Sequence, residues 1–273
     1  MSKAETANIW NRIAPDFDQV GPPFFSYFGR RLVQLVQIPD GAKVLDVATG
    51  RGAILFPAAQ QVGKHGQIIG TDLSMGMVRQ TATETQQANL KQVSLLQMDA
   101  QHLAFATASF DFLLCGHAIF FFPSAVNQFY RALKPGGQIG LTILAKGFLD
   151  WFWELFRTYA SLSDNDKNDK QDDLAVDTPA GLKALLSGAG FENVAVIEEV
   201  TDFIYANEEE WWSTLWTLGV RDQMEKMKPA TLENFKTDIS QKLQPFKQSD
   251  GIHLLFRCLF ASGSKSNTRH LNE

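Results

Sequence analysis

A glycine-rich turn and two carboxylates stand at the ends of successive expected strands. The turn is VLDVATGRG at 44–52, in which Gly50 and Gly52 separate an expected strand from an expected helix. Glycines let a backbone turn tightly beside a ligand, and the helix N-terminus that follows offers free N–H groups to an anion. Asp72 ends the next strand, where a carboxylate can accept from both hydroxyls of a ribose, and Asp99 closes the third, where it could accept from an adenine amino group. The pattern predicts a nucleotide-containing cofactor; the alternative is a structural turn with two helix-capping carboxylates.

The details of the turn indicate which cofactor fits. A dinucleotide fold usually has GxGxxG over a pyrophosphate, whereas this turn lacks the third glycine and carries Asp46 ahead of the other two. A carboxylate there repels a pyrophosphate and attracts an amino-acid ammonium, directly or through water. S-adenosylmethionine has a ribose, an adenine and such an ammonium, and is therefore the predicted cofactor. No Cys/His cluster has zinc spacing, and no metal is expected.

An alternation of expected strands and helices positions these residues. Strands are expected at 43–48, 67–72, 93–99, 109–116 and 138–145, with helices in most of the intervals. Strands that alternate with helices pair in parallel through right-handed crossovers, so the expected class is α/β, with the strand ends at one edge of the sheet. After residue 147 we expect aromatic helices, a long helical insert, and the strands FENVAVIEEV and HLLFRCLFAS.

The chain resembles class I S-adenosylmethionine-dependent methyltransferases in six motifs, which are VLDVATGRG, GTDLSMGMV, QMDAQHLAF, FDFLLCGHAIFFFP, LKPGGQI and LLSGAGFENV. It is most similar to the branch of ubiquinone/menaquinone-biosynthesis and natural-product small-molecule methyltransferases, and WNRIAPDFD near the start also resembles that branch. The resemblance implies a Rossmann-like seven-stranded, mostly parallel sheet with an antiparallel last strand, plus helical lid and cap inserts. The expected limits are a lid at 1–40, a cofactor-binding core at 41–147, an aromatic cap insert at 148–180, a core helix and strand at 181–204, a helical cap insert at 205–250, a last core strand at 251–263 and a tail at 264–273.

The resemblance also implies which residues bind the cofactor. The loop Ala48–Gly52 would contact the methionine part, Asp72 the ribose, and Met75 would flank the adenine, whose edge Asp99 and the backbone of Ala100 would bind. The expected cofactor-binding residues are Phe17, Asp46, Ala48, Thr49, Gly50, Gly52, Asp72, Leu73, Met75, Asp99, Ala100, Cys115, Gly116 and His117.

His117 is the candidate catalytic base, because it follows the fourth strand at the ligand edge and an ordinary histidine pKa suits proton transfer near neutral pH. The alternative is a residue that only packs beside the methionine part. The branch frequently has a pair of histidines after this strand, where this chain has Ile119-Phe120-Phe121. An amine can attack a sulfonium once it is neutral, so the missing pair favours nitrogen over oxygen or carbon as the acceptor atom.

Aromatic residues indicate the substrate. The chain has 21 Phe, 6 Trp and 4 Tyr, and many lie outside the expected core strands. In such folds inserts sit over the carboxyl ends of the strands, where rings would shield a flat or greasy molecule. The alternative is that these rings form the core of the cap or a dimer surface. The candidate pocket residues are Phe24, Tyr27, Phe28, Phe120, Phe121, Trp153, Trp212 and Trp216.

Composition excludes several classes of protein. The net charge of −5 argues against nonspecific nucleic-acid binding, and no apolar run is long enough to span a membrane. The absence of a secretory signal and two cysteines in apolar runs indicate a reducing, cytoplasmic setting. We expect methyl transfer to a hydrophobic small molecule in specialised metabolism, by a monomer or homodimer. The alternatives are a nicotinamide-dependent oxidoreductase and a catalytically silent binding protein of the same fold.

Overall fold

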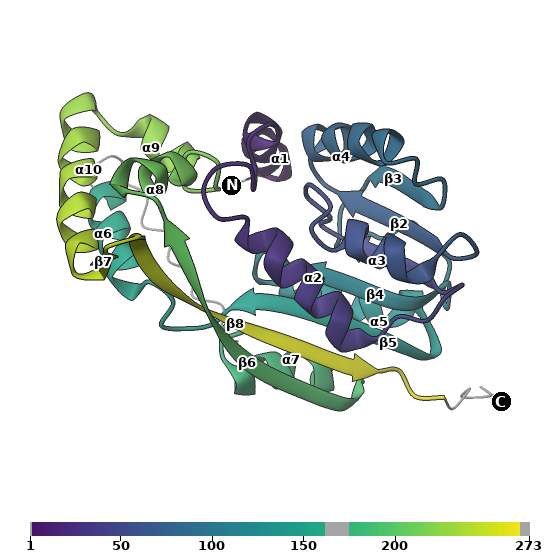
Figure 1. Ribbon diagram of the computed structural model, residues 1–273. Coiled ribbons are helices and arrows are strands. Elements are labelled where there is room, and N and C mark those ends of the chain that lie inside the picture. Colours follow the sequence, from purple (N-terminus) through teal and green to yellow (C-terminus); the bar gives the residue numbers. More distant parts are fainter. Residues whose placement is uncertain (1, 162–174, 268–273) are drawn as a thin grey trace.

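A computed structural model describes residues 2–161 and 175–267, and Figure 1 shows a twisted sheet with helices on both faces and a group of helices at one end. The strands are β1 (Lys43–Val47), β2 (Gln67–Asp72), β3 (Val93–Gln97), β4 (Phe110–Gly116), β5 (Leu133–Leu144), β6 (Glu192–Tyr205), β7 (Lys247–Gln248) and β8 (Gly251–Ser264). The helices are α1 (Lys3–Ile13), α2 (Phe24–Val36), α3 (Leu55–Val62), α4 (Met75–Gln87), α5 (Val126–Ala132), α6 (Asp150–Ser161), α7 (Pro179–Gly188), α8 (Glu208–Leu215), α9 (Arg221–Lys226) and α10 (Pro229–Leu243), with short 3-10 turns η1 (Ile119–Phe121), η2 (Pro123–Ala125) and η3 (Gln244–Phe246). We call α6, α8, α9 and α10 the cap.

The sheet has the order β3-β2-β1-β4-β5-β8-β6, and the short β7 pairs with β8 alone. β1 to β5 pair in parallel, whereas β8 runs antiparallel to both β5 and β6. This confirms the expected fold class. The chain winds outward from β1 to β3 and then returns to the other side of β1 with β4. The carboxyl ends of β1 and β4 therefore flank the switch point at which open α/β sheets bind ligands.

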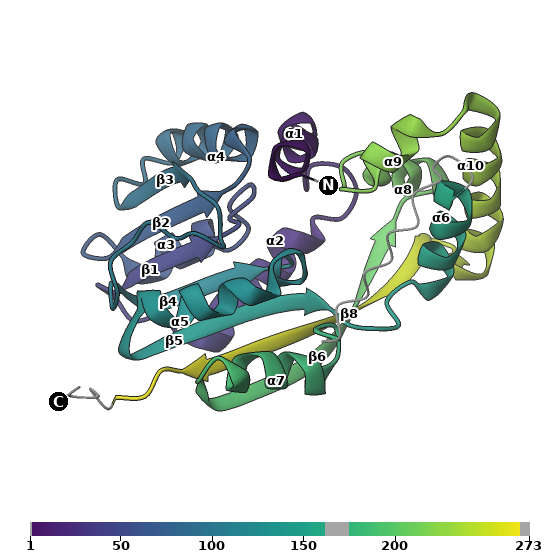
Figure 2. The ribbon, with the colours of Figure 1, turned by 180° about the vertical axis from the view of Figure 1, so that it is seen from behind.

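Helices bury both faces of the sheet. α2 and α3 lie in front of it in Figure 1, and α5 and α7 lie on the opposite face, seen in Figure 2. Successive residues of β1 accordingly enter different core clusters: Val44 packs with residues of α2 and α3, and Leu45 with residues of α5 and α7. Side chains alternate across a strand, so apolar residues on both faces mark a sheet covered on both sides.

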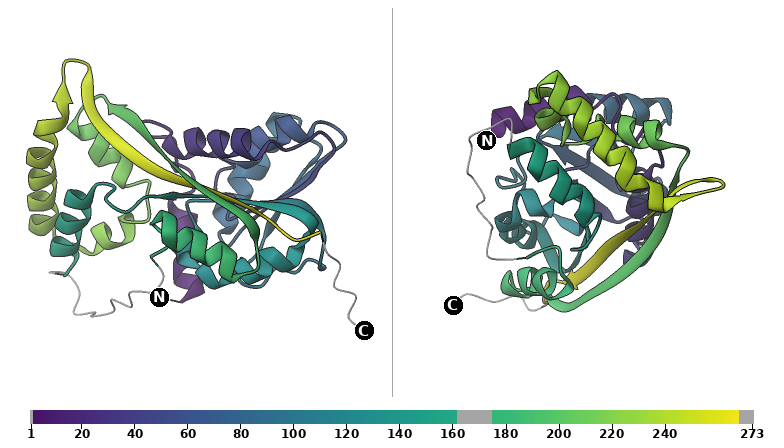
Figure 3. Two further views of the ribbon diagram at one scale, coloured as in Figure 1. Left: turned by 90° about the horizontal axis from the view of Figure 1, so that it is seen from below. Right: turned by 90° about the vertical axis from the view of Figure 1, so that its left-hand side faces the viewer.

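The antiparallel pair β6 and β8 reaches beyond the core to the cap (Figure 3). The two strands pair from Glu192 and Ser264 to Tyr205 and Ile252, further than the segments FENVAVIEEV and HLLFRCLFAS predicted. In this extension Phe203, Tyr205 and Phe256 are buried on the face that meets the cap and α2. The expected helical insert at 205–250 is three helices, of which the last begins at Pro229, followed by the β7 turn.

Two further boundaries differ from the sequence prediction. The apolar spacing of FGRRLVQLVQI predicts a helix over residues 28–38, whereas α2 begins at Phe24, four residues earlier. Its N-cap is Pro23, which has no capping group, and the Asp18 carboxylate instead accepts from the N–H groups of Phe25 (3.3 Å) and Ser26 (2.9 Å). The segment AVNQFYRALKPG predicts a helix that ends in Pro-Gly-Gly, whereas β5 begins at Leu133 and includes Pro-Gly-Gly, because a register shift between Phe110 and Phe112 of β4 accommodates it.

The N-terminal helix α1 lies between α4 and the cap (Figures 1 and 2). Ser2 and Glu5 cap its first turn in a reciprocal pair of hydrogen bonds. Within the described residues, no helix is long and apolar enough to cross a membrane. The expected domain limits stay predictions.

Candidate functional site

The turn after β1 has a backbone that few residues adopt. Ala48, Gly50 and Gly52 have φ angles of 54°, 52° and 80°. A Cβ on Gly52 would lie 2.6 Å from the Phe56 ring, so glycine is required there by space as well as by conformation. Ala48 adopts the left-handed conformation with a side chain, which costs about 1–2 kcal/mol. Strain of this kind concentrates at ligand sites.

Asp72 holds this turn against the start of α4. Its Oδ2 accepts from the Gly50 N–H at 2.9 Å, and its Oδ1 accepts from the Ser74 N–H at 2.8 Å. Burial raises the pKa of Asp72, and the N–H groups of Ser74 and Gly50 partly offset that effect. A carboxylate has about four acceptor positions, so the backbone N–H groups of Ser74, Gly50 and Leu73 leave one for a ribose hydroxyl.

Asp46 lies near the carboxyl end of β1 and is more deeply buried than Asp72. Its side chain is 1% exposed; Oδ2 accepts from the Thr49 hydroxyl at 2.6 Å, and Oδ1 has no partner within the described residues. Burial raises the pKa of Asp46 to about 7, and the nearby Asp72 contributes in the same direction. A buried acceptor without a partner marks a place where a ligand donor is missing, and an ammonium would favour the ionised form.

Helix α1 contacts the adenine side of the expected site through Lys3. Asp99 follows β3 by two residues and accepts from Lys3 Nζ at 2.5 Å and from the Gln101 N–H at 2.9 Å. Ala100 is buried beside it, Leu73 and Met75 are half-buried at the start of α4, and so is the neighbouring Gly76. Leu73, Met75, Asp99 and Ala100 remain predicted cofactor contacts.

The end of β4 places a histidine among aromatic rings. Cys115 is a buried free thiol, and Gly116 faces Ile54, which a Cβ would approach to 2.8 Å. The ring of His117 lies 5.5 Å from Phe25 and 5.4 Å from Phe28, centroid to centroid, and neither ring nitrogen has a partner within the described residues. Burial lowers the pKa of His117 to about 3, so the ring is neutral at physiological pH.

The segment after α1 closes over the turn. Phe17 stacks on Phe25 at 4.7 Å and meets Trp10 edge-on at 6.0 Å. A Cβ on Gly50 would lie 3.6 Å from Phe17. Arg51 donates to the Pro15 carbonyl at 2.6 Å and pairs with Glu84 of α4, which fastens this segment to the core. Phe17 therefore lies over the glycine turn, and its contact with the cofactor stays a prediction.

The structure divides the predicted pocket aromatics into three groups. Phe24 and Phe28 are buried against Phe203, while Tyr27 is 41% exposed at its edge. Phe120 and Phe121 are exposed on η1, and Phe121 meets Trp10 of α1 at 5.8 Å. The tryptophans are in the cap: Trp212 packs on Trp216 and Phe235, and Trp153 on Phe152 and Phe156. Phe24 contacts Phe25, which meets His117, and Phe121 meets Trp10, which meets Phe17. A pocket role for all eight residues stays a prediction.

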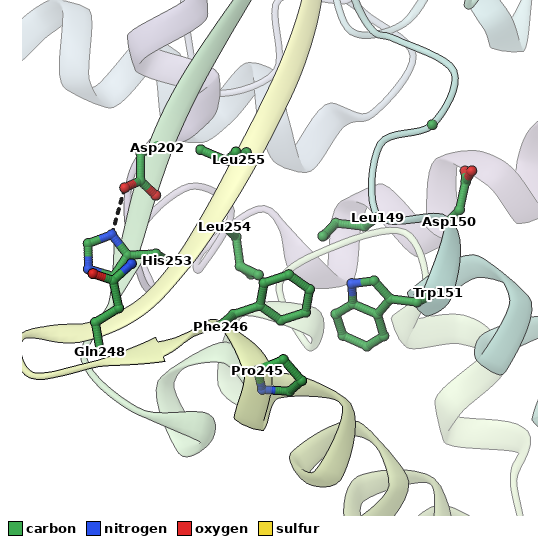
Figure 4. Close-up of a pocket in the computed structure, with 11 residues that line it drawn as sticks. Leu149, Asp150, Trp151, Asp202, Pro245, Phe246, Gln248, His253, Leu254 and Leu255 are labelled. Carbon is green, nitrogen blue, oxygen red and sulfur yellow. Dashed lines mark hydrogen bonds and ion pairs between the residues drawn. The ribbon is translucent and has the colours of Figure 1, made fainter.

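A cavity of about 490 Å³ lies at the far end of the β6–β8 pair, away from these residues (Figure 4). Leu254, Trp151 and Phe246 form its apolar wall. At its rim the carboxylates of Asp202 and Asp250 accept from the ring nitrogens of His253, at 2.6 Å and 2.9 Å. None of the expected cofactor residues lines it. Within the described residues, no group of His, Cys, Asp and Glu could hold a metal ion.

Sequence reasoning missed two residues of α1 that contact the site. Asn11 Oδ1 accepts from the Ser74 hydroxyl and the Gly76 N–H, both at 2.7 Å, and Lys3 pairs with Asp99. Their partners are 63 to 96 residues away in the chain, and no local pattern marks such contacts. The only available signal was that the segment WNRIAPDFD resembles the methyltransferase branch.

Comparison with known proteins shows that the part of the chain that carries this site is similar to methyltransferases. Residues 44–137 match the model of a methyltransferase domain, which covers β1 to the start of β5. The chain is 36% identical over 143 residues to aklanonic acid methyltransferase DauC of Streptomyces sp. (strain C5), covering 51% of this chain and 65% of that protein. It is 39% identical over 137 residues to nocamycin O-methyltransferase of Saccharothrix syringae, covering 49% of each. The chain thus spans about half to two thirds of the length of these relatives.

The solved structures share the fold. Phosphoethanolamine N-methyltransferase 2 of Haemonchus contortus, solved with S-adenosylhomocysteine, superposes with a TM-score of 0.52 at 22% identity, covering 86% of this chain and 51% of that one. Residues 44–137 match the methyltransferase-domain model, and the predicted resemblance to class I S-adenosylmethionine-dependent methyltransferases is confirmed.

Proposed function

We propose that this protein transfers the methyl group of S-adenosylmethionine to a hydrophobic small molecule, in specialised metabolism. The observation that carries the proposal is the buried pair Asp46 and Asp72 around the turn Ala48–Gly52, inside a methyltransferase domain. The relatives named as methyltransferases support it, and they favour it over a nicotinamide-dependent oxidoreductase.

The residues present fit the cofactor. Asp72 would accept from the ribose hydroxyls, Asp46 would attract the ammonium, and the turn gives close approach at Gly50, where only Phe17 stands opposite. Bound S-adenosylmethionine supplies a methyl group on a positively charged sulfur. The chain has to align the acceptor and exclude water, and Phe17, Phe25 and Phe28 provide an apolar environment for that purpose.

Titration with S-adenosylhomocysteine tests this proposal. Asp72→Ala should raise the dissociation constant at least about tenfold, because a charged hydrogen bond contributes about 1.5–3 kcal/mol. Asp111→Ala is the matched control. Asp111 lies at the amino end of β4, at the edge of the sheet opposite to the predicted cofactor site, and its carboxylate accepts from the Lys43 N–H and from Lys134. Binding of NADH in place of S-adenosylhomocysteine, or equal affinity of the Asp72→Ala and wild-type proteins, would refute the proposal.

We further propose that the acceptor atom is the oxygen of an acidic hydroxyl. A histidine whose pKa lies near 3 is too weak a base to take a proton from an ammonium, whereas an enol or carboxylic acid ionises without help. The name of the nocamycin relative supports oxygen. Nitrogen, which the missing histidine pair favoured, is distinguished by incubating ¹³C-methyl-labelled cofactor with candidate metabolites and recording NMR spectra of the purified product. Correlations from the labelled methyl group identify whether it is bonded to oxygen or to nitrogen, and an N-methyl product would refute this proposal.

A further inference from the structure

The side chain of Asn11 completes the N-terminal cap of α4. The first turn of a helix has free N–H groups, and the N-cap Ser74 satisfies one of them, the Met77 N–H, at 3.1 Å. Asn11 Oδ1 accepts from the Gly76 N–H at 2.7 Å and from the Ser74 hydroxyl at the same distance. The Asn11 side chain therefore accepts from one free N–H of α4, that of Gly76. It also orients the Ser74 hydroxyl, which accepts from the next N–H, that of Met77.

Gly76 makes this contact sterically feasible. A Cβ at that position would lie 2.9 Å from the Cα and 3.0 Å from the carbonyl oxygen of Asn11. Because the obstacle is backbone, a side chain on residue 76 would push α1 away from α4. Asn11 of α1 and Gly76 of α4 are thus matched to each other. Asn11 supplies the hydrogen-bond acceptor, and Gly76 leaves room for it because it has no side chain.

The contact continues into the cofactor site. The Ser74 N–H donates to Asp72 Oδ1, whose other oxygen accepts from the Gly50 N–H. Asn11, Ser74, Asp72 and Gly50 thus form one hydrogen-bonded chain from α1 to the glycine turn. At the other end of α1, Lys3 pairs with Asp99, the predicted adenine contact.

We infer that Asn11 is a positioning residue for the cofactor site: it holds segment 72–76 in the geometry that binds the ribose and adenine. This inference rests on the proposed function. A consequence is that α1 forms part of the wall of the cofactor site, so loosening its contact with Gly76 lowers cofactor affinity even when every group that touches the cofactor is intact.

Calorimetric titration of the full-length protein with S-adenosylhomocysteine tests the inference. Asn11→Ala removes the acceptor and should raise the dissociation constant about tenfold, the effect of one to two lost hydrogen bonds. Asn11→Asp keeps an acceptor oxygen at a helix N-terminus, which favours negative charge, and should stay within about threefold of wild type. Gly76→Ala attacks the same contact from α4 and should reproduce the loss.

Arg12→Ala is the matched control on the same helix. Arg12 pairs with Asp222 at 2.8 Å and Glu225 at 3.0 Å, and both partners belong to α9 of the cap rather than to α4. The affinity of this variant for S-adenosylhomocysteine should stay within about twofold of wild type, even if the melting temperature falls. In steady-state assays, Asn11→Ala should raise the KM for S-adenosylmethionine more than it lowers kcat.

Three outcomes overturn the inference. Equal affinity of the Asn11→Ala, Gly76→Ala and wild-type proteins would show that the contact is irrelevant to the cofactor. An equal loss in Arg12→Ala would show that only general anchoring of α1 matters. Absence of S-adenosylhomocysteine binding by the wild-type protein would refute the proposed function itself, and this inference with it.

Discussion

Replacing Asp46 by asparagine should stabilise the cofactor-free protein and weaken its binding of the cofactor. Asp46 is 1% exposed, and burial raises its pKa from an ordinary value of 3.8 to about 7. In the unfolded chain the group ionises near pH 4, whereas in the folded protein it ionises only near pH 7. The folded state therefore binds more protons between these values, and the free energy of unfolding falls as the pH rises through this window.

The size of the effect follows from the shift. One pKa unit corresponds to about 1.4 kcal/mol, so ionised Asp46 costs the folded protein about 4 kcal/mol above pH 7, as an upper bound. The side chain introduced by Asp46→Asn carries no charge and keeps an oxygen for the Thr49 hydroxyl. At pH 8 the variant should be more stable than wild type, and at pH 4 the difference should vanish.

Cofactor affinity should change in the opposite direction. A carboxylate attracts the ammonium of S-adenosylhomocysteine, so wild-type affinity should rise between pH 6 and 8 as Asp46 ionises, whereas that of Asp46→Asn should not. Urea unfolding from pH 4 to 8, paired with calorimetric titration, measures both quantities. Asp150→Asn, at an exposed position that starts α6, is the control for the charge change. Parallel pH profiles of unfolding for wild type and Asp46→Asn would refute the reasoning.

His117→Phe keeps a ring between Phe25 and Phe28 but removes both nitrogens. If His117 orients the acceptor, kcat should fall at least about tenfold while the affinity for S-adenosylhomocysteine stays unchanged; weaker affinity at normal kcat would support packing instead. Ala48→Gly relieves a left-handed backbone and should raise the free energy of unfolding by about 0.5–1 kcal/mol, whereas Ala82→Gly inside α4 should lower it by about 1 kcal/mol, both measured in urea. A loss of stability in Ala48→Gly would contradict the strain argument.

Most of the sheet could be predicted because its signals are local. A buried parallel strand has a compact apolar run, and the end of a helix has a glycine or proline nearby, so β2 and β4 match their predicted ranges to within a residue. The start of α2 could not be predicted, because its cap is supplied by Asp18 from outside the helix. The extension of β6 beyond FENVAVIEEV to Tyr205 has no local signal, since Phe203 and Tyr205 are buried by the cap and by α2, to which no local pattern points.

In the candidate site, too, residues with a local sequence signal could be predicted, whereas properties set by distant parts of the chain could not. The turn and Asp72 were found because a βα unit fixes the spacing between a glycine loop and the next strand end. The protonation of His117 could not be found, because its pKa depends on rings of α2 that lie about 90 residues earlier in the chain. A histidine at the ligand edge predicts a base only if a neighbouring group such as a carboxylate supports its charged form, and neither ring nitrogen of His117 has such a partner within the described residues.

Neighbouring residues of α1 show what a sequence pattern leaves open. Asn11 contacts α4 and Arg12 contacts α9, so one helix joins the cofactor domain to the cap. An amphipathic pattern predicts that a helix has a buried face, but it does not predict which other helices pack against that face. Here the partners are 65 and 210 residues away, and a glycine on one of them decides the fit. The resemblance could therefore place α1 as a lid, whereas its attachment to the first turn of α4 required the arrangement of the whole chain in space.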